Sequence, residues 1–96
     1  MPKSNNSERP VIILTEFKEI FFGYTKDTTG DRIQLHNARQ ACYFSEKTHG
    51  LLGLASMGPQ SGSRIGPSAN LEVRKIVNVI ECTSKAADAW EAAKWE

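Results

Sequence analysis

The sequence predicts an α+β fold, with a small, curled antiparallel β-sheet of about five strands and two short α-helices. Short apolar runs rich in β-branched and aromatic residues recur along the 96-residue chain, with turn residues between them, and such runs predict strands. Two other segments carry apolar residues at helical spacing. A chain of this length forms one domain, and helices are the natural cover for one face of so small a sheet.

The limits of the domain are predicted from composition. Residues 1–9 are polar, so we expect a disordered or frayed N-terminal lead-in, followed by a single domain over residues 10–96. The lead-in lacks the apolar core of a secretory signal. No apolar run approaches the roughly 20 residues that span a bilayer, so we expect a cytoplasmic protein with no membrane partner.

The first half of the chain predicts three strands. Residues 11–14 form a buried strand in this interpretation, and residues 19–25 form a second one, with a hairpin turn at residues 17–18. A third strand begins at Arg32. Its alternation of polar and apolar residues falters at residues 36–39, which indicates a bulge or bend.

A short helix and a long loop are predicted next. Leucines at helical spacing over residues 45–57 predict the helix, which Gly58 and Pro59 end. Eight of the thirteen residues in the segment 58–70 are Gly, Ser or Pro, so we predict neither helix nor strand there. Loops of this length are uncommon in compact domains and are usually functional or disordered.

The C-terminal segment predicts one strand and one helix. Residues 71–82 form the last strand, and its apolar stretch at residues 76–80 indicates a central position in the sheet. Thr83 or Ser84 can cap a final helix that places Trp90 in the core. Trp95 follows at the end, and we expect it to fray or to dock on a partner subunit.

Composition and motifs argue against several functions. A net charge of +1 makes a nucleic-acid partner unlikely. The two cysteines, Cys42 and Cys82, form no disulfide framework, and their apolar surroundings predict burial. His36 and His49 belong to no metal-binding motif. We therefore expect no metal, no cofactor and no catalytic residue, while an enzyme that degrades its ligand stays open as an alternative.

The long loop is the first candidate binding site. Glycines allow backbone N–H groups to approach a ligand closely, and successive N–H groups can bind an anion. Arginine offers a fork of donors that matches phosphate. The loop residues proposed to bind a ligand are Ser61, Gly62, Ser63 and Arg64. The alternative is a flexible connector with one solvated arginine.

A second candidate site precedes the middle helix. Tyr43 and Phe44 could stack on a nucleobase, because aromatic faces stack on bases without sequence preference. Arg39 could bind phosphate or stack on a flat ring, and Asn37 could bond to the edge of a base. The alternative is that both aromatics belong to the core and that Arg39 pairs with a surface acid such as Asp31.

Several short motifs together resemble an uncharacterised family of small tailed-phage and prophage proteins, over roughly residues 10–90. The motifs are Phe22-Gly23-Tyr24, Asn37-Ala38-Arg39, Tyr43-Phe44, Leu54-Ala55-Ser56-Met57-Gly58 and Cys82-Thr83. The sequence departs from the family in the loop 60–70, which is richer in Gly and Ser. By analogy of kind, small phage proteins without a catalytic site include anti-defence proteins that sequester nucleotide immune signals.

The expected function is therefore capture of a small molecule without catalysis. We expect a homo-oligomer that sequesters a phosphorylated nucleotide-like signal, such as a cyclic oligonucleotide or a cyclic ADP-ribose derivative, in the cytoplasm of a bacterial host. A core this small leaves little room for a deep private pocket. The alternative is a phage structural or protein-interaction module with no small-molecule ligand.

Overall fold

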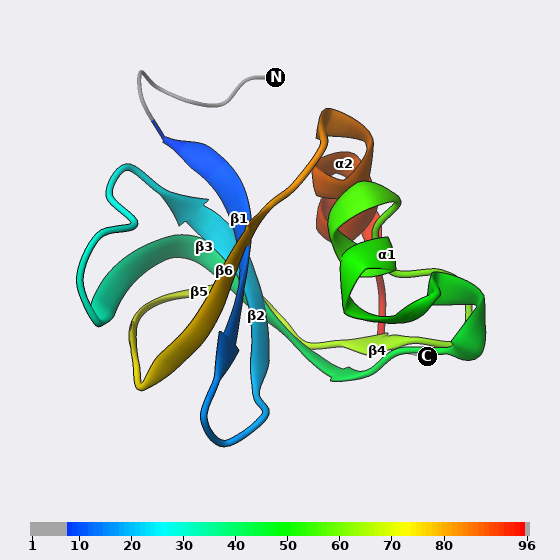
Figure 1. Cartoon of the computed structure of the whole chain (residues 1–96). Coiled ribbons are helices and arrows are strands. Elements are labelled where there is room, and N and C mark those ends of the chain that lie inside the picture. Colours follow the sequence, from blue (N-terminus) through cyan, green and yellow to red (C-terminus); the bar gives the residue numbers. More distant parts are fainter. Residues whose placement is uncertain (1–7, 96) are drawn as a thin grey trace.

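The computed structural model describes residues 8–95, which form one antiparallel sheet and two α-helices (Figure 1). The strands run in the order β4-β3-β2-β1-β6, and β5 also pairs with β3. The elements are β1 (Arg9–Thr15), β2 (Ile20–Thr25), β3 (Arg32–Tyr43), a 3-10 turn η1 (Glu46–Thr48), α1 (Gly50–Ser56), β4 (Arg64–Ile65), β5 (Ala69–Arg74), β6 (Ile76–Glu81) and α2 (Ser84–Ala92). The predicted fold class is confirmed. None of the described helices is long and apolar enough to cross a membrane.

The first two strands form the predicted hairpin. Its turn contains Lys18 in the left-handed region, at a φ of 65°. The side-chain oxygen of Thr15 accepts hydrogen bonds from the backbone N–H groups of Phe17 and Glu19, each at 3.2 Å. The lead-in was predicted to include residues 8 and 9, but Arg9 pairs with Thr25 and begins β1. Residues 1–7 lie outside the described residues.

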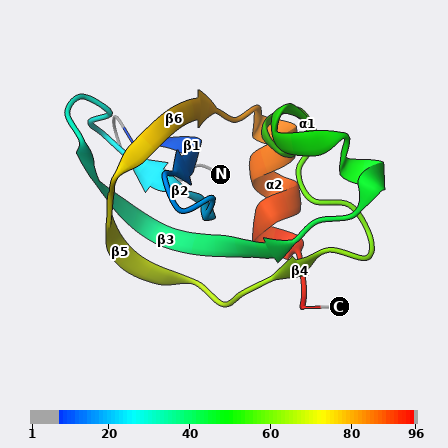
Figure 2. The ribbon, with the colours of Figure 1, turned by 60° about the horizontal axis from the view of Figure 1, so that its bottom comes forward.

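Strand β3 bends where the alternation falters in the sequence. Asn37 has a φ of 52°, and the pairing register shifts between Leu35 and Ala38. Before the bend β3 pairs with β5, and near its end it pairs with β4. Figure 2 shows β3 running as one long strand from the curled sheet to the helices. The bend therefore extends the sheet into a narrow ribbon, made of the end of β3 and of β4, beside α2.

The sheet has a buried core on each face. Both helices cover one face, called the helix side below, where Trp90 stacks on Phe22 with ring centroids 5.0 Å apart. The indole N–H of Trp90 donates to the carbonyl of Leu54 at 3.1 Å, which ties α2 to α1. The curl of the sheet encloses the second core, whose buried residues are Val11, Ile13, Ile33, Leu35, Ala38 and Val73. The predicted core position of Trp90 is confirmed.

The structure corrects the prediction that residues 58–70 contain no strand. Arg64 and Ile65 form β4, and Ala69 and Asn70 begin β5. Ile65 is fully buried on the helix side, so the pairing of β4 with β3 anchors the middle of the predicted loop. A two-residue strand has too short a pattern to show in the sequence.

The prediction of a single central strand over residues 71–82 is also wrong. Lys75 has a φ of 61° and breaks this segment into β5 and β6, which pair with different strands. Strand β6 lies at the end of the strand order and not in its centre. It is apolar on both faces because Ile80 packs against the helix-side core and Val79 packs against the enclosed core.

The two cysteines differ in exposure. Cys82 is half-buried, and burial raises the pKa of its thiol to about 12. Cys42 was predicted to be buried but is exposed. It lies at the end of β3, which extends beyond the main sheet as part of the ribbon. Strand character alone therefore does not imply burial at this position.

Candidate functional site

The eight predicted site residues do not form one site. Some lie on the helix side of the ribbon and others on the face that turns away from the helices. Ile65 of β4 identifies the helix side of the ribbon, because its side chain is buried in the helix-side core. Its neighbour Arg64 is exposed, as expected when successive strand residues point to opposite faces.

Arg39 is a structural residue on the helix side. Its Nε donates to the carbonyl of Gly66 at 2.7 Å, and its Nη1 donates to the carbonyl of Trp90 at 2.6 Å. Weaker bonds reach the carbonyls of Glu91 and Ile65 at 3.4 and 3.3 Å. Desolvation by burial lowers the pKa of Arg39. A cation at a helix C-terminus is favourable, so Arg39 ties the last carbonyls of α2 to the loop after β4.

Asn37 lies beside Arg39 at the rim of a polar hollow. Its backbone N–H donates to Oδ1 of Asn70 at 2.9 Å, which stabilises the bend in β3. Asn37, Arg39, Ser68 and Glu91 line a hollow of about 510 Å³. The carboxylate of Glu91 accepts a hydrogen bond from the Tyr24 hydroxyl, whose pKa is raised by burial and by this carboxylate. The strongest donors around this hollow therefore already bind protein oxygens.

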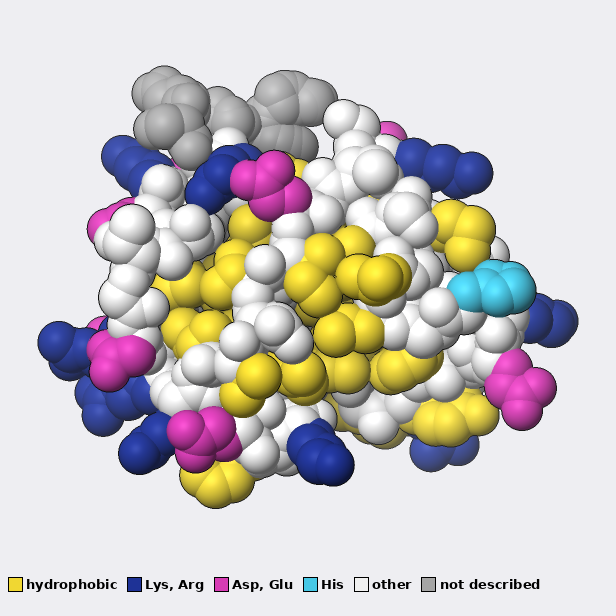
Figure 3. All heavy atoms as spheres, in the orientation of Figure 1, with side chains coloured by type: hydrophobic (Ala, Val, Ile, Leu, Met, Phe, Trp, Pro, Cys, Tyr) yellow, Lys and Arg dark blue, Asp and Glu magenta, His cyan; other side chains and the backbone are white. Residues whose placement is uncertain are grey.

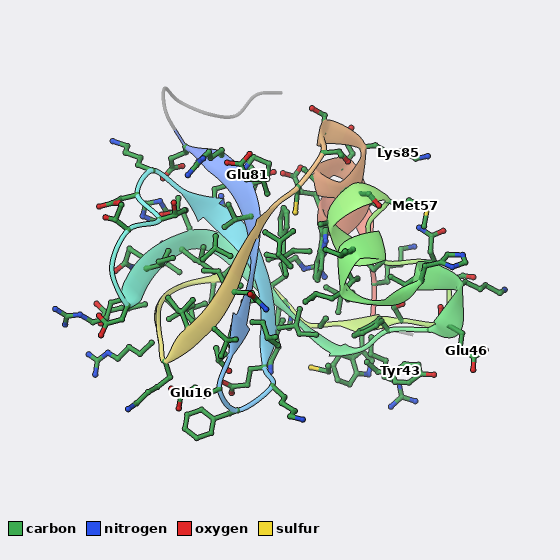
Figure 4. The ribbon with its side chains drawn as sticks, in the orientation of Figure 1. Glu16, Tyr43, Glu46, Met57, Glu81 and Lys85 are labelled. Atoms are coloured by element: carbon green, nitrogen blue, oxygen red, sulfur yellow. The ribbon has the colours of Figure 1, made fainter. Side chains whose placement is uncertain are left out.

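The other face of the ribbon carries three aligned side chains. Tyr43 of β3 lies opposite Arg64 of β4, and Arg64 in turn lies opposite Trp95 in an antiparallel bridge. The guanidinium of Arg64 lies over the Trp95 ring, 5.9 Å from its centroid. Figure 4 shows Tyr43 pointing away from the two helices. We call Tyr43, Arg64 and Trp95 the outer ladder.

The aromatic rings of the outer ladder are unusually accessible. Tyr43 is 56% exposed and Trp95 is 60% exposed. Proteins normally bury most of such rings, because each ring contributes a large apolar area. An arginine between two exposed rings offers two stacking faces and a forked donor on one surface. This chemistry suits a flat, anionic ligand.

The remaining predicted residues differ in their roles. Phe44 is half-buried and packs against the helix-side core. Ser63 is buried, and its hydroxyl accepts a hydrogen bond from the backbone N–H of Ser45 at 3.2 Å. Gly62 has a φ of 91°, so it supplies the left-handed turn before β4. Ser61 is exposed and lines a hollow of about 330 Å³ beside Lys94 and the end of α2.

Sequence reasoning did not assign Trp95 to the ligand site. The signal was a tryptophan next to the charged residues Lys94 and Glu96, beyond the predicted apolar face of the last helix. However, its alignment with Arg64 joins segments about thirty residues apart, and no local pattern reveals such a bridge. The backbone N–H of Ile65 bonds to the carbonyl of Lys94 at 3.5 Å and holds this segment beside β4.

The described residues hold no group of three or more His, Cys, Asp or Glu side chains arranged to bind a metal ion. The ring of His36 pairs with the carboxylate of Glu8, in the part of β3 before the bend at Asn37, whereas Tyr43 of the outer ladder ends the strand. His49 has a φ of 65° and joins η1 to α1.

Comparison with known proteins assigns the chain to a family. No curated protein and no solved structure matches the chain. A family model described as a domain of unknown function, DUF6948, matches residues 8–90, a range that includes α1, most of α2 and every strand of the described residues. The match includes Tyr43 and Arg64 and stops before Trp95. The chain therefore belongs to the DUF6948 family of domains of unknown function.

Proposed function

We propose that this protein captures a flat, phosphorylated, nucleotide-like small molecule on the outer ladder, without catalysis. The observation that carries the proposal is the alignment of Arg64 on β4 between the exposed rings of Tyr43 on β3 and of Trp95 in the segment after α2. Stacking on an aromatic side chain contributes about 1–3 kcal/mol per base. The guanidinium of Arg64 supplies charged donors for phosphate at the same surface.

The structure narrows the set of residues that the proposal needs. Arg39 already binds four carbonyl oxygens, so it positions the ribbon and does not contact the ligand. The backbone N–H of Ser63 donates to the carbonyl of Gln60 at 3.2 Å, so phosphate binding falls mainly to Arg64. In this proposal Trp95 takes the stacking role that was predicted for Phe44, because Trp95 is exposed and Phe44 packs against the helix-side core. Asn37 lies on the helix side and is not part of the proposed site.

The biological role that we propose is sequestration of a nucleotide immune signal in the cytoplasm of a bacterial host. It rests on the resemblance to small phage proteins and on the analogy with anti-defence proteins of the same kind. The ligand class is a cyclic oligonucleotide or a cyclic ADP-ribose derivative. A homo-oligomer is part of the proposal, because one ladder on a small chain encloses little of a ligand, and several copies would raise binding capacity.

Thermal unfolding against a panel of cyclic oligonucleotides, cyclic ADP-ribose isomers and ordinary nucleotides tests the proposal. A ligand at about 100 times its Kd adds roughly 2.7 kcal/mol, which is a shift of about 10 °C or more for a domain of this size. The shift should disappear in Arg64→Ala and persist in Arg74→Ala, a matched exposed arginine on β5. Equal shifts in both variants, or none with any ligand, would overturn the proposal. Recovery of intact ligand after denaturation distinguishes capture from cleavage.

A second candidate function is a protein-interaction module. The observation that favours it is the open edge of β6, which no strand of the described residues covers. This function would be supported instead if a variant with a disrupted β6 edge no longer bound a partner protein and if no nucleotide of the panel shifted the Tm.

A further inference from the structure

The outer ladder presents its three side chains in a fixed order. Arg64 of β4 lies opposite Tyr43 of β3 on one side and opposite Trp95 on the other. Across the ribbon the order is therefore aromatic ring, guanidinium, aromatic ring. Figure 3 shows a hydrophobic side chain beside a basic one at the lower edge of the molecule, below α1, in the region where β4 lies in Figure 1. A ligand that uses all three side chains must carry its own groups in a matching order.

The backbone holds this order without a ligand. The pairing register shifts between Ala41 and Tyr43, so Cys42 is an extra residue in β3 opposite β4. Such a bulge re-aims the side chains beside it. On β4, Ile65 is fully buried on the helix side, so Arg64 points to the opposite face. The three side chains are therefore presented on one surface by strand pairing alone.

The spacing of the two rings excludes a ligand whose bases are stacked on each other. Neighbouring strands lie about 4.8 Å apart, so the backbones of Tyr43 and Trp95, on either side of β4, lie about 10 Å apart. Successive nucleotides of a stacked strand are only about 3.4 Å apart along the helix axis. One base on each ring therefore requires a ligand whose two bases are spread apart.

Arg64 lies where the phosphate of such a ligand would fall. In a dinucleotide the phosphodiester joins the two nucleosides, so it lies between the two bases along the chain. The guanidinium of Arg64 lies over the Trp95 ring, 5.9 Å from its centroid. A guanidinium in such a position keeps its N–H donors at its edge, because they lie in its own plane, and this planar fork matches phosphate. The order base, phosphate, base therefore matches the order ring, guanidinium, ring.

We propose that the outer ladder selects a ligand with two unstacked bases joined by a phosphate, with one base on Tyr43, the other on Trp95 and the phosphodiester on Arg64. This selectivity rests on the proposed function and narrows its ligand class to two-base nucleotides, such as a cyclic dinucleotide. A cyclic ADP-ribose derivative has one base and occupies one ring only. The outer ladder has two rings, so a longer strand gains no third stacking contact.

Calorimetric titration with three adenine ligands tests the selectivity. The probes are a cyclic dinucleotide of adenosine, the linear dinucleotide ApA and AMP. ApA and AMP each carry one phosphate, and the phosphate of AMP has the higher charge, so tighter binding of ApA cannot come from charge. Both two-base ligands should bind at least fivefold more tightly than AMP, because a second stacked base contributes a factor of about 5 to 150.

Variants of the two rings show whether both bases are bound. Tyr43→Ala and Trp95→Ala should each weaken ApA about fivefold or more, and at least one of them should leave the Kd of AMP within about twofold of the wild type. Phe17→Ala is the matched control, because Phe17 is an equally accessible ring in the turn between β1 and β2 and should affect neither ligand. Circular dichroism checks the fold. If an alanine variant unfolds, Tyr43→Leu and Trp95→Leu keep apolar bulk and still remove the ring.

Three results would overturn the selectivity. They are a Kd of AMP within about twofold of that of ApA, ring variants that both weaken AMP as strongly as ApA, and a strand of four adenosines that binds more than about tenfold more tightly than ApA. Capture on the outer ladder would survive the first two results if Arg64→Ala still abolished binding. Absence of binding by every ligand to the wild type would overturn the proposed function together with the selectivity.

Discussion

Arg39 and Arg64 lie on opposite faces of the same short ribbon and serve different purposes. Arg39 donates four hydrogen bonds to backbone carbonyls of α2, of β4 and of the loop after β4. Arg64 is exposed and lies over the ring of Trp95. Arg39 stabilises the fold through these bonds, whereas we propose that Arg64 contacts the ligand.

This comparison indicates that the role of each arginine depends on the face of the strand to which its side chain points. Arg39 lies opposite Phe22 in the sheet, so it points towards the helix-side core, where carbonyls at the end of α2 need donors. Arg64 follows a turn and precedes the buried Ile65, so it points away from the helices. The central claim is therefore that changes on the helix side affect stability, whereas changes to the outer ladder affect binding.

The largest effect is expected from Arg39→Ala. It leaves the carbonyls of Trp90 and Gly66 without their donor, and a hydrogen bond to a charged group contributes about 1.5–3 kcal/mol. We expect a loss of about 2–4 kcal/mol, which is roughly 10–20 °C in Tm. Thermal and urea unfolding measure it. Arg64→Ala is the matched control, with a change within about 0.5 kcal/mol. Equal losses for the two variants would remove the distinction between the two faces.

Arg64→Ala should cause the next largest effect, on binding and not on stability. Loss of a charged hydrogen bond to phosphate corresponds to about a 10- to 150-fold weaker Kd. Calorimetric titration with the ligand that emerges from the thermal panel measures it. Arg64→Lys should recover only part of the affinity, because lysine keeps the charge and lacks the planar fork. Full affinity in Arg64→Ala would place the ligand elsewhere.

Cys82 should make stability fall in alkaline solution. Its pKa is raised from 9.0 to about 12 by burial, so the folded state holds the neutral thiol while the unfolded state ionises first. The contribution of this group is present below pH 9 and is lost as pH rises from 9 towards 12. We expect a loss of about 1 kcal/mol at pH 10 relative to Cys82→Ala. Parallel unfolding curves for the two proteins from pH 8 to 10 would contradict this expectation.

Tyr43 should give the smallest effect, and one confined to binding. Tyr43→Ala removes one stacking face and should weaken binding about fivefold, near the lower end of the range for a stacked base. Tyr43→Phe keeps the ring and should bind like the wild type. The exposure of Tyr43 predicts little change in Tm for either variant. If Phe and Ala weaken binding equally, the hydroxyl and not the ring makes the contact.

The parts of the fold that depend on local sequence were predictable. The hairpin turn at Lys18, the bend at Asn37 and the cap at Thr83 each follow from residues close together in the chain. The hydroxyl of Thr83 accepts from the backbone N–H of Ala86 at 3.0 Å, as expected for a helix start. Such features need no knowledge of which strands become neighbours.

The edge position of β6 and the exposure of Cys42 depend on strand pairing, which the sequence alone did not reveal. The positive φ of Lys75 splits an apolar stretch that looks continuous in the sequence. The candidate site shows the same limit. Tyr43 and Arg64 could be named as binding residues from their chemistry, but their alignment with Trp95 depends on two bridges between distant segments.

Tryptophan fluorescence tests the outer ladder most directly, because Trp90 is fully buried and Trp95 is 60% exposed. Titration with cyclic oligonucleotides and cyclic ADP-ribose isomers should quench the exposed fraction and protect it from iodide. Trp95→Phe should lose this signal, and Arg39→Lys should retain it. Saturable quenching that vanishes in Trp95→Phe is the result that we predict. Ligand binding with unchanged fluorescence, or no quenching by any ligand, would contradict the assignment of this surface.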